Sequence, residues 1–501
     1  MAANTDSSCF SKYSDDSFNT HHLPSTSTAP LSNKLDKKNS QGLLVGPSDC
    51  RRLGAQLRPH IFSRLFHLDT YRCAGLVSKD LSEIGGHQVL NFGEAALELE
   101  DGDLSLIHIG CDNTVSGLVS GYHSATEGIE RNRVRNLIQL ADRDEMEGYV
   151  KRRSGQTSPL AYVLAPKGSY SGSDLSFFGL RLPEPSVLEE DQEEHLVYCT
   201  GEASFVGVSG HNAEKFLTER GVNCEQMPCG LAVLPRLCGK QLGNNRKLSP
   251  AIKNLRDRFG KGWIAVEVSD IPERQENDFA TAVSSLAAAK GWGIVIYSAK
   301  SIGSVPDTTR NKWNLLLGSI GEAVWFDSDN IWDITRMIGN ASFYVGSCLD
   351  SRIIASSFCV PRINTPRADH RNVDYCSVWE MESLPAVLSD EPELWASEMD
   401  TACNVDRSLL QEHAEATARA FFEGFSKACE KTELSPRLFA GETIDHHQAV
   451  AHGQKIAADW MKTAEDRKRF AKLNQGRDFS KSKPTVKDGV KKVVQKFKSG
   501  S

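Results

Sequence analysis

The sequence predicts an α/β fold with two Rossmann-like lobes followed by C-terminal helices, and three observations lead to this prediction. Short apolar runs of strand length alternate with helical apolar stripes through residues 41–365, which is typical of a mostly parallel sheet. A glycine- and charge-rich segment divides this alternation into two halves. After residue 365 the pattern is helical only. The predicted division is an N-terminal lobe at 41–237, a linker at 238–262, a C-terminal lobe at 263–365 and a helical region at 366–475.

The two ends of the chain differ from the rest in composition. Residues 1–40 are rich in Ser, Thr, Asn and Asp without periodic hydrophobicity, which predicts a disordered segment. Residues 462–501 hold 13 Lys/Arg and 4 Asp/Glu within a chain of net charge −7. The basic tail, 476–501, is either a solvated end or a contact for an anionic membrane surface or nucleic acid.

Composition narrows the class of protein. Hydrophobic residues make up 40% and charged residues 25% of the 501 residues, as in soluble globular proteins. No apolar run reaches the roughly 18 residues of a membrane span, and the N-terminus has no apolar signal region. The 13 cysteines form no CxxC pair and indicate reduced thiols. We therefore expect a cytoplasmic protein, with the basic tail as a peripheral contact at the inner membrane face.

The predicted N-terminal lobe begins with the strand 42–46, and the glycine that ends it is a feature of phosphate-binding loops. No GxGxxG or GxxxxGK[ST] follows, so the nucleotide signal is weak. His108, inside an apolar run, is expected to be a hydrogen-bonded core residue. Apolar stripes predict helices at 128–141 and 212–220, and the acidic stretch 184–195 and the Gly/Ser-rich stretch 167–174 are predicted loops. Further strands are predicted at 73–77, 88–90, 105–109, 160–165, 195–199 and 206–208.

The predicted C-terminal lobe has the same alternation. Apolar runs predict strands at 263–268, 293–297, 322–326 and 343–345. An apolar stripe between 279 and 287 predicts a helix, and Ile331, Ile334 and Ile338 predict another at i, i+3, i+7. The last strand is followed by the polar turn 346–351, and a final helix is predicted to open at Arg352.

This polar turn is the main candidate for a binding site. It lies at the carboxyl end of a strand and the amino end of a helix, where ligands usually bind in open α/β sheets. Free backbone N–H groups and the helix dipole favour anions there, and the guanidinium of Arg352 forks onto carboxylate or phosphate. The alternative is a plain strand–helix connection capped by Ser351.

The stretch 329–365 resembles the C-terminal signature of the polysaccharide pyruvyl transferase family. In that family an isoleucine-rich helix and a strand lead to the turn Gly-Ser-Ser-Leu-His-Gly-Arg, and a later Pro-Arg follows a helix. The chain differs from the signature by Cys348 for Ser, Asp350 for His and Ser351 for Gly. The residues in register are Gly346, Ser347, Leu349, Arg352, Pro361 and Arg362.

The resemblance implies a GT-B-like arrangement of the two lobes with the active cleft between them. It also implies a transferase that moves the pyruvyl group of phosphoenolpyruvate onto a sugar of a cell-surface polysaccharide or its precursor, with no metal or other cofactor. Asp350 and Arg352 take the catalytic positions. The donor-binding residues are Gly346, Ser347, Cys348, Ser351 and, at the entrance of an N-terminal-lobe helix, His211.

Three functional hypotheses remain open from the sequence. The first is pyruvyl transfer to a sugar or lipid-linked glycan acceptor; a nucleic-acid partner is not expected. The second is a GT-B-type glycosyltransferase that uses a nucleotide sugar in the same cleft. The third is a non-catalytic relative that binds a glycan or a partner protein.

Overall fold

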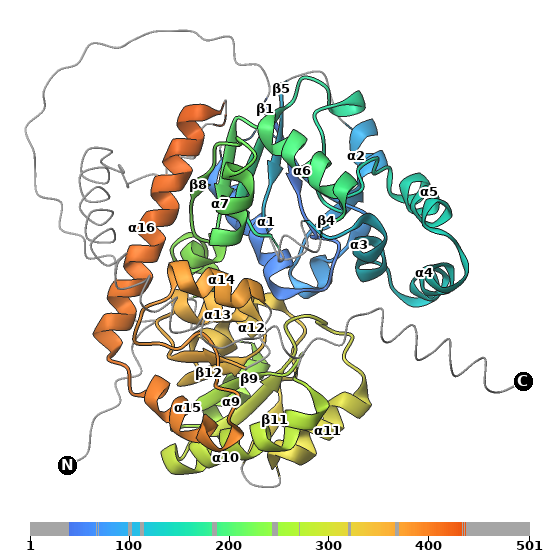
Figure 1. Ribbon diagram of the computed structural model, residues 1–501. Helices are drawn as coiled ribbons and strands as arrows, with labels where there is room; N and C mark the ends of the chain where they lie inside the picture. The colour runs from blue at the N-terminus through green and yellow to red at the C-terminus, as the bar shows by residue number, and fades with distance from the viewer. Residues whose placement is uncertain are drawn as a thin grey trace, which may run out of the picture. The chain divides into compact units, whose positions relative to one another are not determined.

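The computed structural model contains two separate sheets, each flanked by helices (Figure 1). The described residues form one compact unit, in which the first sheet is built by residues 40–226 and the second by residues 263–364. The predicted α/β fold with two sheet-centred lobes is therefore confirmed. The structure describes residues 40–66, 68, 70–98, 103–110, 115–182, 188–242, 249–269, 271–318, 322–365, 370–432, 434 and 436.

The N-terminal sheet has the order β3-β4-β2-β1-β5-β6-β7-β8 and is parallel except for the β3–β4 pair. The strand order from β4 to β7 is the Rossmann order. In this order successive strands are added on one side of β1 up to β4 and on the other side from β5 onward, so the switch point lies between β1 and β5. Its strands are β1 (Ser40–Val45), β2 (Thr70–Gly75), β3 (Lys79–Asp80), β4 (Gln88–Asn91), β5 (Asp103–His108), β6 (Asp174–Leu180), β7 (Phe205–Val208) and β8 (Glu225–Gln226).

The C-terminal sheet is wholly parallel, with the order β11-β10-β9-β12-β13. This is again the Rossmann order, and the reversal lies between β9 and β12. Each lobe has its own apolar core, because strands covered by helices on both faces bury nearly every side chain. The strands are β9 (Trp263–Glu267), β10 (Gly293–Tyr297), β11 (Ala323–Trp325), β12 (Phe343–Gly346) and β13 (Arg362–Asn364).

The helices that bear on the site follow the strands as expected for an α/β fold. The predicted linker, 238–262, contains the end of α8 and the whole of α9, so part of it is helical. The relevant helices are α1 (Leu53–Leu65), α3 (Leu118–Ala125), α4 (Gly128–Leu140), α7 (His211–Thr218), α8 (Leu234–Leu242), α9 (Pro250–Arg258), α12 (Ile331–Gly339), α13 (Leu349–Ser357) and α14 (His370–Trp379).

Two predicted strands of the N-terminal lobe are wrong. Residues 195–199 lie in α6 (Glu190–Gly201), because Glu189 and Gln192 form a capping box and acidic residues occupy the first turn. Residues 160–165 are buried but form no strand apart from an isolated bridge at Leu160. The side chain of Gln156 donates to the carbonyls of Ala161 and Val163 there, in place of a neighbouring strand.

Strand β6 and helix α4 show the limits of the apolar pattern. The sequence reading assigned no strand to Asp174–Leu180, although this segment lies in the middle of the first sheet. The predicted helix at 128–141 is confirmed as α4, but Val134 is its one buried residue and Ile138 is 45% exposed. His108 is confirmed as a core residue: it stacks on Phe177 and accepts a hydrogen bond from the Leu164 N–H.

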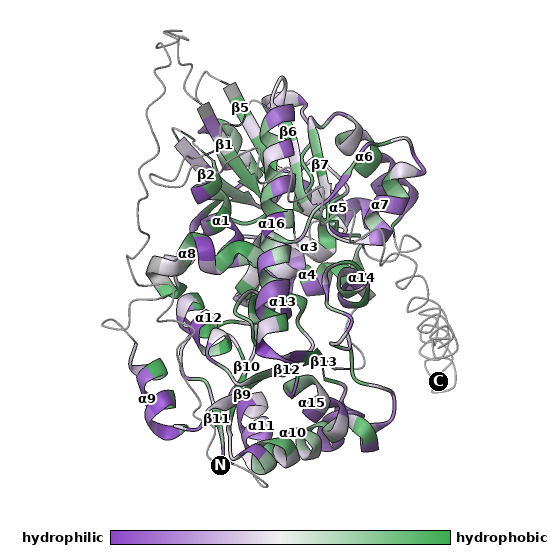
Figure 2. Cartoon of the chain, turned by 90° about the vertical axis from the view of Figure 1, so that its left-hand side faces the viewer, coloured by the Kyte–Doolittle hydropathy of each residue, from purple (hydrophilic) through white to green (hydrophobic). Residues whose placement is uncertain are grey.

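The C-terminal helix α16 (Arg407–Lys431) returns to the N-terminal lobe after α14 and α15 (Trp395–Cys403) (Figure 1). Its Phe421 and Phe425 pack against the α1 residues Phe62 and the adjacent Phe66. Figure 2 shows many hydrophilic residues along this helix, as expected when one stripe of a helix is buried. Helices α14, α15 and α16 lie in the helical region predicted at 366–475, and the part of that region beyond residue 436 lies outside the described residues.

Candidate functional site

The predicted binding turn is shorter and more buried than expected. Helix α13 begins at Leu349 rather than at Arg352, so Asp350 and Ser351 lie in its first turn. Cys348 is the N-cap residue, and burial raises the pKa of its thiol to about 12. A thiol with such a pKa holds its proton at neutral pH and is a poor nucleophile.

Gly346 and Ser347 are tied to the neighbouring strand through a buried carboxylate. Glu267, at the carboxyl end of β9, accepts hydrogen bonds from the backbone N–H and the hydroxyl of Ser347 at 3.2 and 2.9 Å. The same carboxylate accepts from the N–H groups of Ser269 and Ala299. Glu267 therefore joins the ends of β9, β10 and β12, and the polar groups of Ser347 serve the scaffold.

Arg352 has a structural position that conflicts with the predicted anion-binding role. Its guanidinium is 1% exposed and lies 2.8 Å from Glu380, which also pairs with Arg362. Further Arg352 hydrogen bonds reach Asn364 and two backbone carbonyls. Burial opposes ionisation of Glu380, but Arg362 and Arg352 hold its pKa well below the usual range. The donor groups of Arg352 are therefore occupied within the C-terminal lobe.

Asp350 and His211, from different lobes, are not brought together at one site. The Asp350 carboxylate contacts Arg58 and Arg181 of the N-terminal lobe. His211 lies on the surface at the start of α7, beside Gln226 and Glu214. Ser351 is fully buried inside α13. The segment that carries the resemblance therefore lies at the carboxyl edge of the C-terminal sheet. The polar side chains of this segment, however, bond to other groups of the protein.

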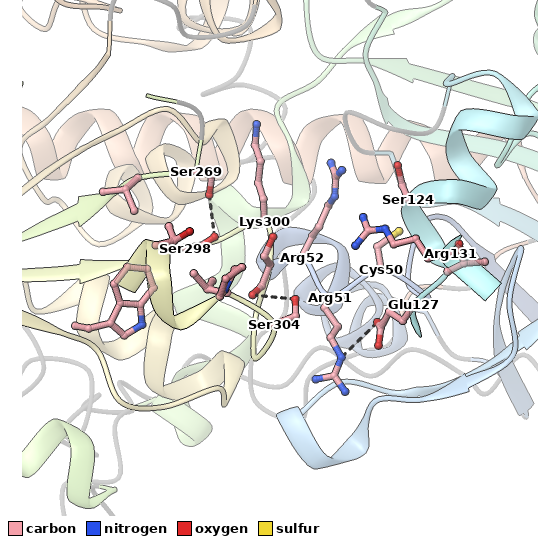
Figure 3. Close-up of a pocket in the computed structure, with 17 residues that line it drawn as sticks. Cys50, Arg51, Arg52, Ser124, Glu127, Arg131, Ser269, Ser298, Lys300 and Ser304 are labelled. Atoms are coloured by element: carbon pink, nitrogen blue, oxygen red, sulfur yellow. Dashed lines mark hydrogen bonds and ion pairs between the residues drawn. The ribbon is translucent and has the colours of Figure 1, made fainter. Parts of the chain in front are cut away.

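A cavity of about 360 Å³ lies between the carboxyl ends of the C-terminal strands and the start of α1 (Figure 3). It is lined by Ser269, which follows β9, by Ser298, which directly follows β10, and by Trp325, the last residue of β11. On the other side the loop after β1 contributes Arg51 and Arg52, which precede α1. This is the edge at which ligands usually bind in α/β sheets.

The two lobes meet at this cavity through backbone hydrogen bonds. The Leu53 N–H donates to the carbonyl of Ala299 at 2.9 Å, and the Ile302 N–H donates to the carbonyl of Arg51 at 3.0 Å. The loop after β1 and the loop after β10 are thereby held against each other. The polar lining is therefore built by both lobes together.

The charge of the cavity lining is predominantly positive. The lining contains four cationic side chains and one carboxylate, that of Glu127; the cations are Arg51, Arg52, Arg131 and Lys300. In Figure 3 the side chains of Lys300 and Arg52 extend in the same direction, whereas Arg51 turns to Glu127. Burial opposes ionisation of Glu127, but Lys79 and Arg51 offset it and lower the pKa. The excess of cations makes the cavity suited to an anionic group.

The sequence reading missed these cavity residues, although one signal was present. Arg51 and Arg52 lie between the first strand and the first helix. In parallel sheets, ligands often bind at this position, where a strand ends and a helix begins. Lys300 and Trp325 carry no such local signal. They line the same cavity as Arg51 and Arg52 because the two lobes pack together, and the sequence alone does not show this packing.

Among the described residues no group of three or more His, Cys, Asp or Glu side chains is arranged to hold a metal ion. Over the same residues, every helix is too short or too polar to cross a bilayer. The predicted membrane contact of the basic tail lies outside the described residues, so it stays a prediction.

No protein-family model and no curated protein matches the sequence. The chain is similar in structure to UDP-GlcNAc 2-epimerase from Methanocaldococcus jannaschii, in complex with UDP-GlcNAc and UDP (13% identity, 74% of this chain and 93% of that one, TM-score 0.40). It is also similar to a UDP-forming alpha,alpha-trehalose-phosphate synthase from Burkholderia xenovorans (13%, 79% and 97%, 0.45). A third similar structure is UDP-GlcNAc 2-epimerase from Neisseria meningitidis bound to UDP-GlcNAc (8%, 77% and 99%, 0.43). At these values the assignment of function rests on the cavity itself.

Proposed function

We propose that the chain is a GT-B-like glycosyltransferase that binds a nucleotide sugar in the cationic cavity and transfers the sugar to a glycan acceptor. In this reaction the acceptor oxygen forms a bond to the anomeric carbon, and the bond from that carbon to the phosphate oxygen breaks. The nucleoside diphosphate leaves with the electron pair, and the acceptor hydroxyl loses its proton. The charge that develops on the leaving diphosphate needs cations held in place.

The observation that carries the proposal is the composition of the cavity. Arg52, Arg131 and Lys300 supply the positive charge that a diphosphate requires. Trp325 offers an aromatic surface for a nucleobase, and base–aromatic stacking contributes about 1–3 kcal/mol. The volume of about 360 Å³ lies in the range of sites for small ligands and cofactors. Phosphoenolpyruvate, in contrast, has no ring to use the aromatic wall.

Pyruvyl transfer from phosphoenolpyruvate is the second candidate, and the resemblance around Gly346 and Arg352 supports it. The same cations suit a carboxylate and a phosphate. In both candidates the acceptor is a sugar or a lipid-linked glycan, and the basic tail is the segment proposed to reach an anionic membrane surface. The two candidates differ in the donor, so donor binding separates them.

The experiment is calorimetric titration of the protein with UDP-, GDP- and ADP-sugars and with phosphoenolpyruvate. We expect one nucleotide sugar to bind, and Lys300→Met to weaken it by about tenfold to a hundredfold, the effect of losing a charged hydrogen bond. Trp325→Ala should lower the affinity for the nucleotide sugar but leave the affinity for inorganic phosphate unchanged. Lys215→Met is the matched control, because Lys215 is exposed on α7 away from the cavity.

The possible results separate the hypotheses. Binding of phosphoenolpyruvate without any nucleotide sugar contradicts the proposal and supports the second candidate. Binding of neither donor contradicts both and leaves the non-catalytic relative. A nucleotide sugar that binds equally well to the Lys300→Met protein would show that the site lies elsewhere.

A further inference from the structure

Two buried arginines of the N-terminal lobe converge on one carboxylate of the C-terminal lobe. Arg58 of α1 contacts Asp350 with both terminal nitrogens, Nη2 to Oδ1 at 2.5 Å and Nη1 to Oδ2 at 3.4 Å. Arg181, which follows β6, places Nη2 3.5 Å from the same Oδ1. Each arginine side chain is 1% exposed, and that of Asp350 is 11% exposed. The arrangement is a fork-on-carboxylate contact with a second cation beside it.

The first turn of α1 is shaped to receive this carboxylate. A Cβ atom added to Gly54 would lie 2.0 Å from Asp350 Oδ2 and 2.3 Å from its Cγ. Only a glycine therefore leaves room for the group. The carboxylate also lies at the amino end of a 13-residue helix, whose dipole favours negative charge. Charge, shape and dipole thus agree on an anion at this position.

We propose that Arg58 and Arg181 form a carboxylate-binding site, separate from the cavity, that the native chain fills with its own Asp350. Two buried guanidinium groups need a counter-charge, because an uncompensated buried cation is costly. Asp350 supplies that charge from the opposite lobe and so joins the lobes. When its side chain is removed, a small external carboxylate takes its place.

The inference does not depend on the proposed function, because none of the three residues lines the cavity. It also gives Asp350 a role other than catalysis. The sequence resemblance places a catalytic side chain at this position, whereas the structure places an internal anion there. A donor substrate would then bind to the cations of the cavity and not to Arg58 and Arg181.

The test is chemical rescue of Asp350→Ala. We expect the melting temperature of the variant to fall by several degrees, because breaking a buried ion pair is strongly destabilising. Titration with sodium acetate should restore it along a saturable curve. Sodium chloride at equal ionic strength should restore much less, because chloride cannot accept from the fork in the bidentate manner.

Two variants serve as controls. Asp350→Asn keeps the volume of the side chain without its charge, so it should be destabilised and acetate should not restore it. Arg58→Met combined with Asp350→Ala removes the fork, and acetate rescue should disappear. If Asp350→Ala does not fold alone, it should fold when refolded in acetate.

Any one of four results would overturn the proposal. The first is an unchanged melting temperature of Asp350→Ala, and the second is an equal effect of acetate on Asp350→Ala and the native protein. The third is rescue that persists without Arg58, and the fourth is failure of Asp350→Ala to fold in acetate.

Discussion

At the scale of single residues, the chain shows that residue type predicts charge but not partner. Asp350 and Arg352 lie two positions apart in the segment that resembles a catalytic signature. Arg352 nevertheless pairs with Glu380, 28 positions further along the chain, and Asp350 pairs with Arg58 of the N-terminal lobe. Both partners are distant in sequence. A buried charge requires such a partner, but which acid or base supplies it follows only from packing.

The position of Arg352 leads to a stability prediction. Arg352→Ala should lower the free energy of unfolding by about 3–5 kcal/mol, because Glu380 keeps its buried charge with one arginine fewer. Donor affinity of the folded protein should stay unchanged. Urea denaturation and calorimetric titration measure the two quantities.

Arg143→Ala is the comparison for this variant, because Arg143 makes ion pairs on the surface. We expect that change to cost less than about 1 kcal/mol. A loss of donor affinity in folded Arg352→Ala, without loss of stability, would restore the original site prediction.

At the scale of elements, local signals explain the boundaries and tertiary contacts explain the exceptions. Asn330 caps α12, and an aspartate caps α16, as such residues do at helix starts. The acidic capping box that begins α6 outweighs the strand-like run that follows it. By contrast, α16 stays in place through aromatic side chains that pack on another lobe's helix.

Helix α16 gives a prediction about packing. Phe421 is fully buried and contacts Phe62 of α1, so Phe421→Ala should destabilise the protein by about 3–5 kcal/mol through lost burial and a new cavity. The neighbouring Phe422 is only partly buried, and Phe422→Ala should cost clearly less. Chemical denaturation of both variants compares them. Equal costs would mean that α16 is not held by its buried stripe.

At the scale of the whole molecule, buried histidines predict how stability depends on pH. Burial lowers the pKa of His60 and His413 to about 4 and of His87 and His108 to about 3, from an ordinary value of 6.5. The folded protein keeps these rings neutral, whereas the unfolded chain binds protons below pH 6.5. Their contribution is therefore fully present above pH 6.5 and is lost as the pH falls from there toward 4.

The measurement is the free energy of unfolding in urea at pH 7.5, 6.5 and 5.5, above the range in which most carboxylates titrate. Each histidine should contribute a slope of up to about 1.4 kcal/mol per pH unit below 6.5. His108→Gln should reduce the slope, because it removes one of these buried rings. A stability that is constant between pH 6.5 and 5.5 would contradict the prediction.

The sequence by itself determined the α/β class, the two sheets and many of the element positions. Strands such as 293–297 and helices such as 331–338 carry their period and their caps within a few residues, so local physical chemistry suffices. It also located the relevant edge of the C-terminal sheet, because a strand that ends in a polar turn before a helix is visible in the chain.

Only the tertiary structure decided which side chains at that edge line a cavity. Ser347 and Arg352 bond inward to Glu267 and Glu380, while Arg52 and Lys300, nearly 250 positions apart in the chain, share one cavity. Periodicity reports whether a side chain is on the buried face of its own element. Which group the side chain contacts depends on how the two sheets pack together. No local sequence pattern encodes contacts between residues so far apart in the chain.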